Sequence, residues 1–344
     1  MSQHRASILP RRLGKLEVGT RPTPVPRETK RLSRSLLPPV FNPIDWNIRD
    51  NGWDFVKQYP AVLGSDGAGV IEAVGPKVKR KDFKVGDKVF FQGIYERVDS
   101  YETTFQEKCI AETDIISKIP ENITEDEAST IPVGSVAALV GLFQKTGIDF
   151  PVNRPTANGK GVLILGGSSS VGQFGLQLAR IAGFSPIVTT ASAQHTDFLK
   201  SLGATHVFDR NVDAKTIQSA FSTPVSLVVD SISVDSTQSL AYDVLTTPSP
   251  VPGAHLSLML PLVDSLKEKN ADSKITIHEV YGSSHSCRDL SVPFWQNVGQ
   301  WIKDGKFVPN RVRVVKGGLA AVPEALDLSR KGVSGVKIVV HPQE

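Results

Sequence analysis

A turn of small residues between two apolar segments constrains the fold of this chain more than any other feature. Residues 161–166 (GVLILG) form a short aliphatic run, residues 167–172 (GSSSVG) form the turn, and an amphipathic segment follows. This order predicts a strand, a tight loop and a helix. A loop at the start of a helix presents backbone N–H groups and the positive end of the helix dipole, so it predicts an anion site. A second strand over residues 184–191 (FSPIVTTA) completes a crossover of roughly 30 residues, the unit that binds a dinucleotide pyrophosphate.

One position of the turn departs from the G-x-G-x-x-G fingerprint. Gly167 and Gly172 fit its first and third glycines, but Ser169 stands where the second is expected. A middle glycine lets the backbone approach the phosphates closely, whereas Ser169 adds a side chain and a hydroxyl donor. The alternative for the three serines is a simple polar turn. The residues predicted to bind the pyrophosphate are Gly167, Ser168, Ser169, Ser170, Val171 and Gly172.

The chain alternates strand and helix from residue 161 onward. The predicted strands are 161–166, 184–190, 205–208 and 225–230, and the predicted helices are 172–182, 194–202 and 213–221. This alternation predicts a doubly wound parallel sheet with helices on both faces. Further strands over 254–260 and 275–281 would extend that sheet. Residues 149–158, with two prolines and two asparagines, predict a loop.

The segment before residue 160 has a different pattern, typical of a β domain. Strands are predicted over 70–74 and 84–90, and a strand pair over 105–119. Thr124 is predicted to cap a helix that is interrupted at Pro132 and resumes over 135–146. The C-terminal part returns to mixed structure, with strands over 311–315 and 336–341. One helix is predicted after Pro293, running to about Lys303, and another from Pro323 to Lys331.

The charge of the chain is small overall but concentrated at its start. The formal net charge is +4, and the first 34 residues contain Arg5, Arg11, Arg12, Lys15, Arg21, Arg27, Lys30, Arg31 and Arg34. A transit peptide or a nucleic-acid-binding arm would have such a cluster. Prolines interrupt any amphipathic helix there, so an irregular, solvated segment is the expected structure. No run approaches the roughly 18 apolar residues of a membrane span.

The cysteine content argues against a zinc site. Cys109 and Cys287 are the two cysteines, whereas a structural zinc lobe needs four thiolates and a catalytic zinc needs three Cys, His or acidic ligands. We therefore predict no metal. Two cysteines also give no disulfide framework, which fits a reducing compartment and makes a cytoplasmic location the default expectation.

Five segments together resemble the medium-chain dehydrogenase/reductase superfamily, in its zinc-free branch. They are residues 42–46 (NPIDW), 59–69 (YPAVLGSDGAG), 83–89 (FKVGDKV), 201–209 (SLGATHVFD) and 332–340 (GVSGVKIVV). Within that branch the chain looks like the fungal trans-acting enoyl reductases and quinone oxidoreductase-like proteins, which share residues 166–172 (GGSSSVG) and 313–318 (RVVKGG). The resemblance covers about residues 40–344 in the expected order.

The resemblance implies a GroES-like β-barrel domain and a Rossmann domain with the active site between them. The implied boundaries are 1–130 for the first part of the barrel, 131–285 for the Rossmann domain and 286–344 for the return to the barrel. Zinc-dependent members carry a cysteine near the position of Asn42 and Gly-His-Glu where this chain has Gly64, Ser65 and Asp66. Without zinc no Lewis acid polarises an alcohol or ketone, which favours reduction of an activated C=C bond or of a quinone.

The segment before Asn42 departs from the family. Relatives have a clear strand there, but residues 28–41 (ETKRLSRSLLPPVF) contain two prolines and several basic residues, a composition that predicts a poor central strand. A damaged barrel or an error in the gene model would each explain this.

The end of the second strand favours NADP(H). An acidic residue there would hold the ribose 2′-hydroxyl of NAD, but residues 189–195 (TTASAQH) contain none. The resemblance places Ser192 and His195 near the 2′-phosphate, and Arg210 where relatives often have tyrosine. Arginine is a planar, charged donor that suits phosphate. A plain surface charge is the alternative for Arg210.

The resemblance also assigns the remaining site residues. Asp45, Trp46 and Asn47 would border the nicotinamide, with core packing as the alternative for Trp46, and Lys337 would reach the cofactor from the C-terminal segment. The implied substrate cleft is lined by Val133, Gly134, Ser135, Val280 and Tyr281. Hydride would pass to the β-carbon of an α,β-unsaturated carbonyl. Tyr95 and Tyr281 are weak candidates for the proton donor, and solvent is a competitor.

Three functions remain open at this stage. The leading one is an NADPH-dependent enoyl or enone reductase acting on a small molecule or a polyketide-type thioester. The second is a quinone reductase, and the third is a cofactor-binding protein without catalysis. The small net charge argues against a nucleic-acid partner, and the sequence is equally compatible with a monomer and a homodimer.

Overall fold

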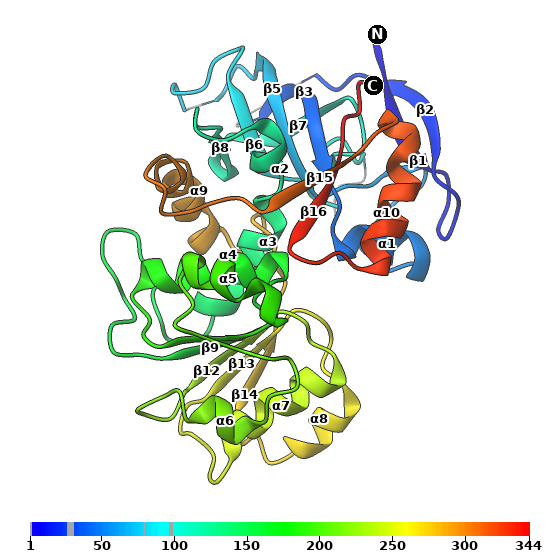
Figure 1. Cartoon of the computed structure of the whole chain (residues 1–344). Helices are drawn as coiled ribbons and strands as arrows, with labels where there is room; N and C mark the ends of the chain where they lie inside the picture. Colours follow the sequence, from blue (N-terminus) through cyan, green and yellow to red (C-terminus); the bar gives the residue numbers. More distant parts are fainter. Residues whose placement is uncertain (1, 26–30, 79, 96–98) are drawn as a thin grey trace. The chain divides into compact units, whose positions relative to one another are not determined.

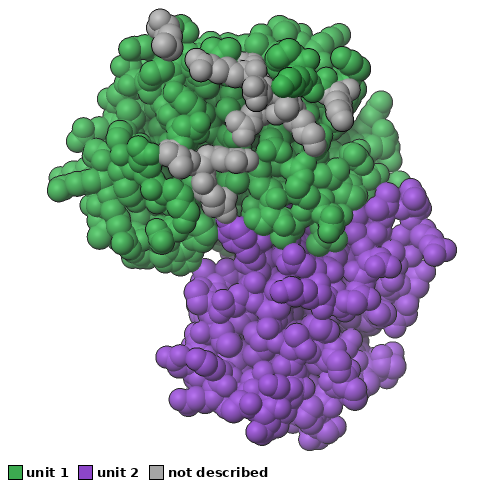
Figure 2. Space-filling view, turned by 180° about the vertical axis from the view of Figure 1, so that it is seen from behind, with its two compact units in different colours: residues 1–133, 283–344 green, residues 134–282 purple. Residues whose placement is uncertain are grey.

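The computed structural model describes residues 2–25, 31–78, 80–95 and 99–344. The chain forms two compact units, one of residues 1–133 with 283–344 and one of residues 134–282 (Figure 2). The domain boundaries expected from the resemblance were 130/131 and 285/286. Among the described residues no helix is both long and apolar enough to cross a membrane.

The unit of residues 134–282 is built on a six-stranded parallel sheet. Its strands in spatial order are β11 (His206–Phe208), β10 (Ile187–Thr190), β9 (Val162–Leu165), β12 (Leu227–Asp230), β13 (His255–Leu258) and β14 (Thr276–Glu279). Residues of β9, β10 and β12 are buried along their whole length, as expected for a sheet covered on both faces. The doubly wound parallel sheet predicted from the alternating pattern is therefore confirmed.

Helices cover both faces of this sheet (Figure 1). On one side lie α4 (Ser170–Ala182) and α5 (Thr196–Leu202), and on the other α6 (Ala214–Gln218), α7 (Asp235–Thr246) and α8 (Asp264–Lys269). Helix α4 ends at Gly183, which has the left-handed backbone conformation (φ 83°) typical of a helix C-terminus. The order strand, turn, helix predicted for residues 161–182 is thus the order observed.

Within its described residues, the other unit contains two sheets and four α-helices. The larger sheet has the order β15 (Arg311–Val315), β16 (Val336–Val340), β3 (Arg31–Val40), β5 (Asp66–Val74), β6 (Lys88–Gln92) and β8 (Ile116–Lys118), and β7 (Lys108–Glu112) also pairs with β3. The smaller sheet is β2 (Glu17–Pro22), β1 (Gln3–Leu9) and β4 (Ala61–Val62). The helices are α1 (Pro43–Asn51), α2 (Glu125–Ser129), α9 (Arg288–Lys303) and α10 (Val322–Lys331).

Two helices begin earlier than predicted, in both cases because a proline does not break the helix. Helix α3 (Pro132–Phe143) starts at Pro132 itself rather than at residue 135, since the first turn of a helix needs no N–H from proline. Helix α9 starts at Arg288 and contains Pro293, which was predicted to precede it. The missing hydrogen bond costs stability, but Phe294 and Trp295 bury a large apolar area directly after it.

The N-terminal segment is part of the core, contrary to the expectation of an irregular arm. Strand β1 pairs with β2 and β4, and Ala6 and Leu9 are fully buried. Buried and exposed positions alternate along much of β1, and Arg5 on its exposed side pairs with Glu107 at 2.6 Å. Some of the basic residues at the start of the chain therefore lie on the polar face of a half-buried strand. The interpretation of the segment as a charge cluster missed this alternation of buried and exposed positions.

Residues 31–40 form a central strand, which overturns the prediction of a poor one. Strand β3 pairs with β5, β7 and β16. Its register with β5 shifts between Ser33 and Arg34 and again between Leu36 and Pro39. Such irregularities explain how the prolines are accommodated, because a proline cannot donate to a regular ladder. Residues 28–30 of the questioned segment lie outside the described part of the chain.

Candidate functional site

The turn after β9 has the geometry of an anion-binding loop. Gly166 takes a left-handed conformation (φ 78°), and Ser169 is the N-cap of α4. The loop is held from the neighbouring strand, since Gly166 N–H donates to Thr190 Oγ1 at 3.1 Å and Gly167 N–H donates to Thr190 O at 2.9 Å. The loop therefore sits at the carboxyl ends of the parallel strands, where α/β sheets bind ligands.

Both glycines that match the fingerprint are required by close packing. A Cβ on Gly172 would lie 2.3 Å from the carbonyl oxygen of Gly166, and a Cβ on Gly167 would lie 2.3 Å from Thr189 Oγ1. These contacts are closer than atoms tolerate. Only glycine at these two positions therefore allows the loop and the start of α4 to pack this closely.

Ser169 has a structural task that the fingerprint did not predict. Its hydroxyl accepts the N–H of Gly172 at 3.0 Å and donates to Ser231 Oγ at 2.9 Å. Ser231, directly after β12, donates in turn to the carbonyl oxygens of Leu165 and Gly166. The serine at the middle position therefore caps α4 and ties the loop to β12, which leaves the backbone amides of the loop as the groups that suit an anion.

The residues predicted to meet a 2′-phosphate lie together at one edge of the sheet. Strands β10 and β11 run parallel with Thr190 opposite Phe208, so Ser192 and Arg210 both follow by two residues. Arg210 is exposed, Ser192 is half-buried, and His195 is 8% exposed with Nε2 3.4 Å from Gln194 Nε2. No carboxylate stands between Thr190 and His195.

Helix α3 brings together the predicted substrate segments of the same unit. A Cβ on Gly134 would lie 2.4 Å from Ser170 Oγ, so the start of α3 lies against the cofactor loop. A Cβ on Gly282 would lie 2.8 Å from Ala137 Cα, so the chain after β14 packs on α3 as well. Ser135 is buried, Val280 is half-buried and Tyr281 is 39% exposed beside this contact.

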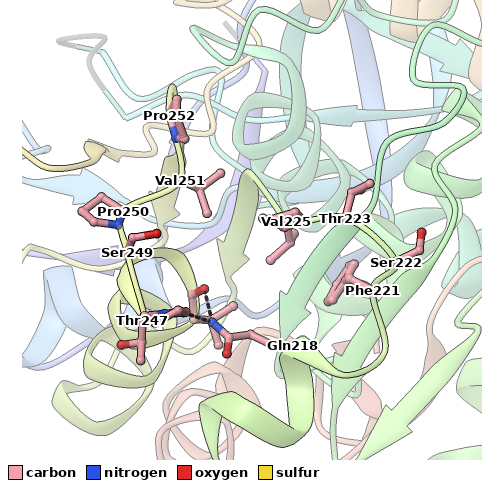
Figure 3. A pocket seen from close by; sticks show the side chains of 13 residues that line it. Gln218, Phe221, Ser222, Thr223, Val225, Thr247, Ser249, Pro250, Val251 and Pro252 are labelled. Carbon is pink, nitrogen blue, oxygen red and sulfur yellow. Dashed lines mark hydrogen bonds between the residues drawn. The ribbon is translucent and has the colours of Figure 1, made fainter.

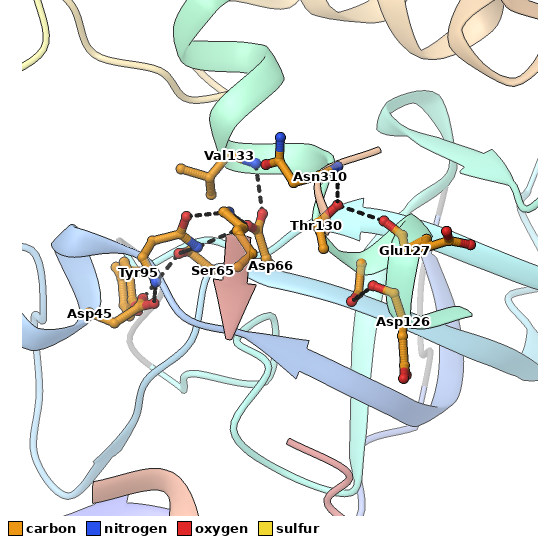
Figure 4. A network of polar contacts seen from close by, with 12 residues as sticks. Asp45, Ser65, Asp66, Tyr95, Asp126, Glu127, Thr130, Val133 and Asn310 are labelled. Carbon is orange, nitrogen blue, oxygen red and sulfur yellow. Dashed lines mark hydrogen bonds and ion pairs between the residues drawn. The ribbon is translucent and has the colours of Figure 1, made fainter. Parts of the chain in front are cut away.

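A second polar site, in the other unit, is centred on a buried ion pair. Lys337 Nζ donates to Asp66 Oδ2 and to Asn42 Oδ1, both at 2.6 Å, and these side chains are almost completely buried. Asp66 also accepts Asn42 Nδ2 at 2.9 Å and the N–H of Val133 at 2.6 Å (Figure 4). We call Asn42, Asp45, Ser65, Asp66, Tyr95 and Lys337 the buried polar cluster.

Strand pairing explains why residues so distant in sequence meet there. Val40 of β3 pairs with Val339 of β16 on one side and with Asp66 of β5 on the other. Lys337 lies two residues before Val339, on the same face of β16. The β3 strand that the sequence made doubtful is therefore the element that joins the two charges.

Asp45 occupies the other side of the buried polar cluster. One carboxylate oxygen accepts the N–H of Asn42 at 2.7 Å and so caps α1, while the other accepts the hydroxyls of Ser65, at 3.0 Å, and of Tyr95 (Figure 4). Tyr95 Oη also accepts the N–H of Gly64 at 2.7 Å. Burial raises the pKa of Asp45 to about 7, because its hydrogen bonds to described residues offset only part of the cost of desolvation. Burial and the neighbouring Asp45 raise the pKa of Tyr95 well above its usual value.

The two neighbours of Asp45 on α1 differ in what they contact. Asn47 is buried and donates to the carbonyl oxygen of Pro43 at 2.9 Å. Trp46 packs on the apolar core of its unit, and its Nε1–H is buried without an acceptor among the described residues. A buried indole N–H normally finds a partner, so this atom suits an acceptor on a bound molecule.

The stability of the fold should depend on pH through Asp45. Its pKa rises from 3.8 to about 7 on folding, so the folded state holds a proton that the unfolded state releases. The stabilisation is complete below pH 4 and is lost as the pH rises through 7. We expect the difference in unfolding free energy between the native chain and Asp45→Asn to fall by about 3 kcal/mol between pH 5 and pH 8, measured by urea denaturation. A difference that is independent of pH would contradict this assignment.

A cavity of about 400 Å³ lies elsewhere in the Rossmann-type unit (Figure 3). Its lining residues, among them Phe221, Val225 and Val251, precede β12 and β13. It therefore opens at the amino ends of the strands, away from the loop at Gly166. Ligands of open α/β sheets bind at the carboxyl ends, so this cavity does not belong to the cofactor site.

Comparison with known families agrees with this architecture. Residues 40–135 match the alcohol dehydrogenase GroES-like domain, and residues 170–248 match the zinc-binding dehydrogenase family. The chain belongs to the medium-chain dehydrogenase/reductase superfamily, with a GroES-like domain and a Rossmann domain.

The chain is similar to fungal oxidoreductases over nearly its whole length. The chain is 32% identical to the trans-enoyl reductase tndF of Aspergillus flavipes over 98% of this chain and 99% of the relative. It is 33% identical to the dehydrogenase pigH of Monascus ruber, over 94% and 95%. Among solved structures, the quinone oxidoreductase of Coxiella burnetii matches with a TM-score of 0.73 at 20% identity, covering 99% of both chains. The chain is thus an oxidoreductase of the trans-enoyl reductase-like kind.

Several residues of the site had no role in the sequence-based prediction. Ser65 and Asp66 were noted only as replacements of zinc ligands, and Ser231 was not singled out. The hydroxyl of Ser231 is hydrogen-bonded to Ser169, which lies more than 60 residues earlier in the chain. No local sequence pattern could therefore reveal this contact. Asp66, in contrast, was detectable: an acid in an apolar, glycine-rich strand signals a buried charge that needs a partner.

Proposed function

We propose that this chain is an NADPH-dependent reductase of activated C=C bonds that works without a catalytic zinc ion. The observation that carries the proposal is the Lys337 ammonium at 2.6 Å from both Asp66 and Asn42. Asn42, Ser65 and Asp66 correspond by resemblance to the zinc ligand positions of other members. Among these three positions Asp66 is the carboxylate, and a buried ammonium already pairs with it, so a dication beside the ammonium would face like-charge repulsion.

The loop between β9 and α4 is suited to bind a dinucleotide cofactor. Backbone amides of the segment from Ser168 to Val171, at the start of α4, would hold the pyrophosphate. Arg210 and Ser192 would donate to a 2′-phosphate at the ends of β11 and β10. NADPH, when bound, supplies a hydride for the β-carbon of an α,β-unsaturated carbonyl.

The chain's own groups would bind, orient and protonate the substrate. Trp46 Nε1–H is a donor that suits the carbonyl oxygen, on which negative charge grows as the β-carbon is reduced. The α-carbon then takes one proton. Tyr95 is committed to Asp45 and Gly64, so Tyr281 and solvent are the proposed sources. Catalysis in this scheme is mainly positioning.

A substrate panel with metal removal tests the proposal. The purified chain is dialysed against a chelator, and NADPH oxidation is followed with a 2-enone, an enoyl thioester and a quinone. We expect turnover of the enone or thioester that survives dialysis. Faster turnover of the quinone would favour the second function, and no turnover of any compound would favour a non-catalytic protein. Activity that is lost on dialysis and regained only with zinc would overturn zinc independence.

Cofactor choice should depend on Arg210. Arg210→Glu places a carboxylate where a 2′-phosphate would sit, so we expect NADPH to bind ~10–100-fold more weakly with NADH unchanged. Fluorescence titration measures both constants. Arg154→Glu is the matched control, since Arg154 is also exposed but lies beside Pro155, which packs on Gly183 at the far end of α4. Tighter binding of NADH than of NADPH by the native chain would contradict the assignment.

A further inference from the structure

We infer that Glu102, Glu112 and His285 form a binding site for one divalent transition-metal ion, separate from the buried polar cluster. Each residue directs one possible ligand atom toward the others, and the three atoms lie within 4.8 Å of one another. Zinc bonds of about 2.0–2.2 Å place ligands roughly 3.5 Å apart, so side-chain rotations of about an ångström would close the site. Carboxylate oxygens are hard ligands and imidazole is a borderline ligand, a combination that suits zinc or manganese rather than a soft metal.

The backbone that presents the three ligands is firmly held. His285 directly follows Ser284, which makes three hydrogen bonds. The N–H of Ser284 donates to Gln92 Oε1 at 2.7 Å, and its carbonyl oxygen accepts the hydroxyl of Ser291 at 2.7 Å. Its own hydroxyl accepts Trp295 Nε1–H at 3.0 Å. Glu102 is 2% exposed, and its carbonyl oxygen accepts the N–H of Ile94 at 3.2 Å. Rigid presentation of this kind favours a metal site over a chance meeting of surface side chains.

The charges around the site favour a cation. Arg288 donates to Glu112 and to Asp114, both at 3.0 Å. One guanidinium is thus shared by two carboxylates, Glu112 and Asp114, which are 16% and 23% exposed, and Glu102 adds a carboxyl group that is 2% exposed. Arg288 acts on Glu112 as a hydrogen-bonding partner that fixes the orientation of a ligating carboxylate. A dication placed among these carboxyl groups needs no residue of the proposed reductase site.

Zinc titration of the full chain tests the site without reference to activity. We expect isothermal titration calorimetry to show one Zn²⁺ per chain, with Glu102→Gln and His285→Gln each weakening binding by 10–100-fold. Zn²⁺ should raise the melting temperature of the native chain but of neither variant. Far-UV circular dichroism verifies that both variants are folded.

The control is His341→Gln, which removes a histidine that lies beside two other carboxylates, Asp126 at 3.0 Å and Glu344 at 3.2 Å. This variant should bind Zn²⁺ like the native chain. Absence of stoichiometric binding by the native chain would overturn the inference, as would binding that survives Glu102→Gln and His285→Gln. Cobalt, which reports its ligands by visible absorption, provides an independent readout, and its spectrum should change in both variants.

Discussion

Replacing Lys337 by methionine should destabilise the folded chain by about 3–5 kcal/mol. The substitution leaves the Asp66 carboxylate buried, with hydrogen bonds from Asn42 and Val133 but without its cation. Methionine has a similar length, so the loss of charge rather than of volume dominates. Chemical denaturation at pH 7 measures the effect, and the melting temperature should fall in parallel.

Two further variants compare the contribution of the buried ion pair to stability with that of an exposed ion pair. Lys108→Met breaks an exposed pair with Glu72, at 2.8 Å, and should cost at most about 1 kcal/mol. The double variant Lys337→Met with Asp66→Asn removes both charges and should regain part of the stability lost in the single variant. If Lys337→Met cost no more than Lys108→Met, the buried pair would not hold the cluster together.

Replacing Gly172 by alanine should reduce NADPH affinity by more than about tenfold and destabilise the Rossmann-type unit by roughly 2–4 kcal/mol. The new Cβ would lie 2.3 Å from the carbonyl oxygen of Gly166 and 2.8 Å from Gly167 Cα. Both contacts are with backbone, so α4 or the loop must move. Fluorescence titration with NADPH and urea denaturation measure the two effects.

Gly175→Ala is the matched control on the same helix. Its Cβ would meet Ile164 Cδ1 at 3.3 Å, the flexible end of a side chain, and alanine is the better helix former. Its affinity for NADPH should stay within about twofold of the native value. Equal loss of affinity in both variants would mean that α4 tolerates no change anywhere, and the close approach at Gly172 would then have no special role.

The Rossmann-type part of the fold was predictable because its signals are local. The apolar run, the glycine turn and the amphipathic helix of residues 161–182 each occupy a short window, and the observed elements follow that order. The third glycine was recognised for the same reason. The role of Ser169 was not, since its partner Ser231 lies on another strand and no short window contains both.

The barrel-type part was predicted less well, because its strands are ordered by long-range pairing. The sequence around residues 31–40 contains prolines and basic residues, yet it pairs with three strands whose contribution a single segment does not reveal. The N-terminal strand was missed because its exposed face carries the charges. The buried ion pair joins residues 271 positions apart, so only the folded topology could identify it.

The hydroxyl bridge from Ser169 to Ser231 has a consequence for how a cofactor would associate. The loop is fastened to two strands, through Thr190 on one side and Ser231 on the other. Little conformational freedom then remains to be lost when an anion arrives, so a larger share of the contact energy appears as affinity. The serine in place of the middle glycine thus gives up some closeness to the phosphate in exchange for a preorganised loop.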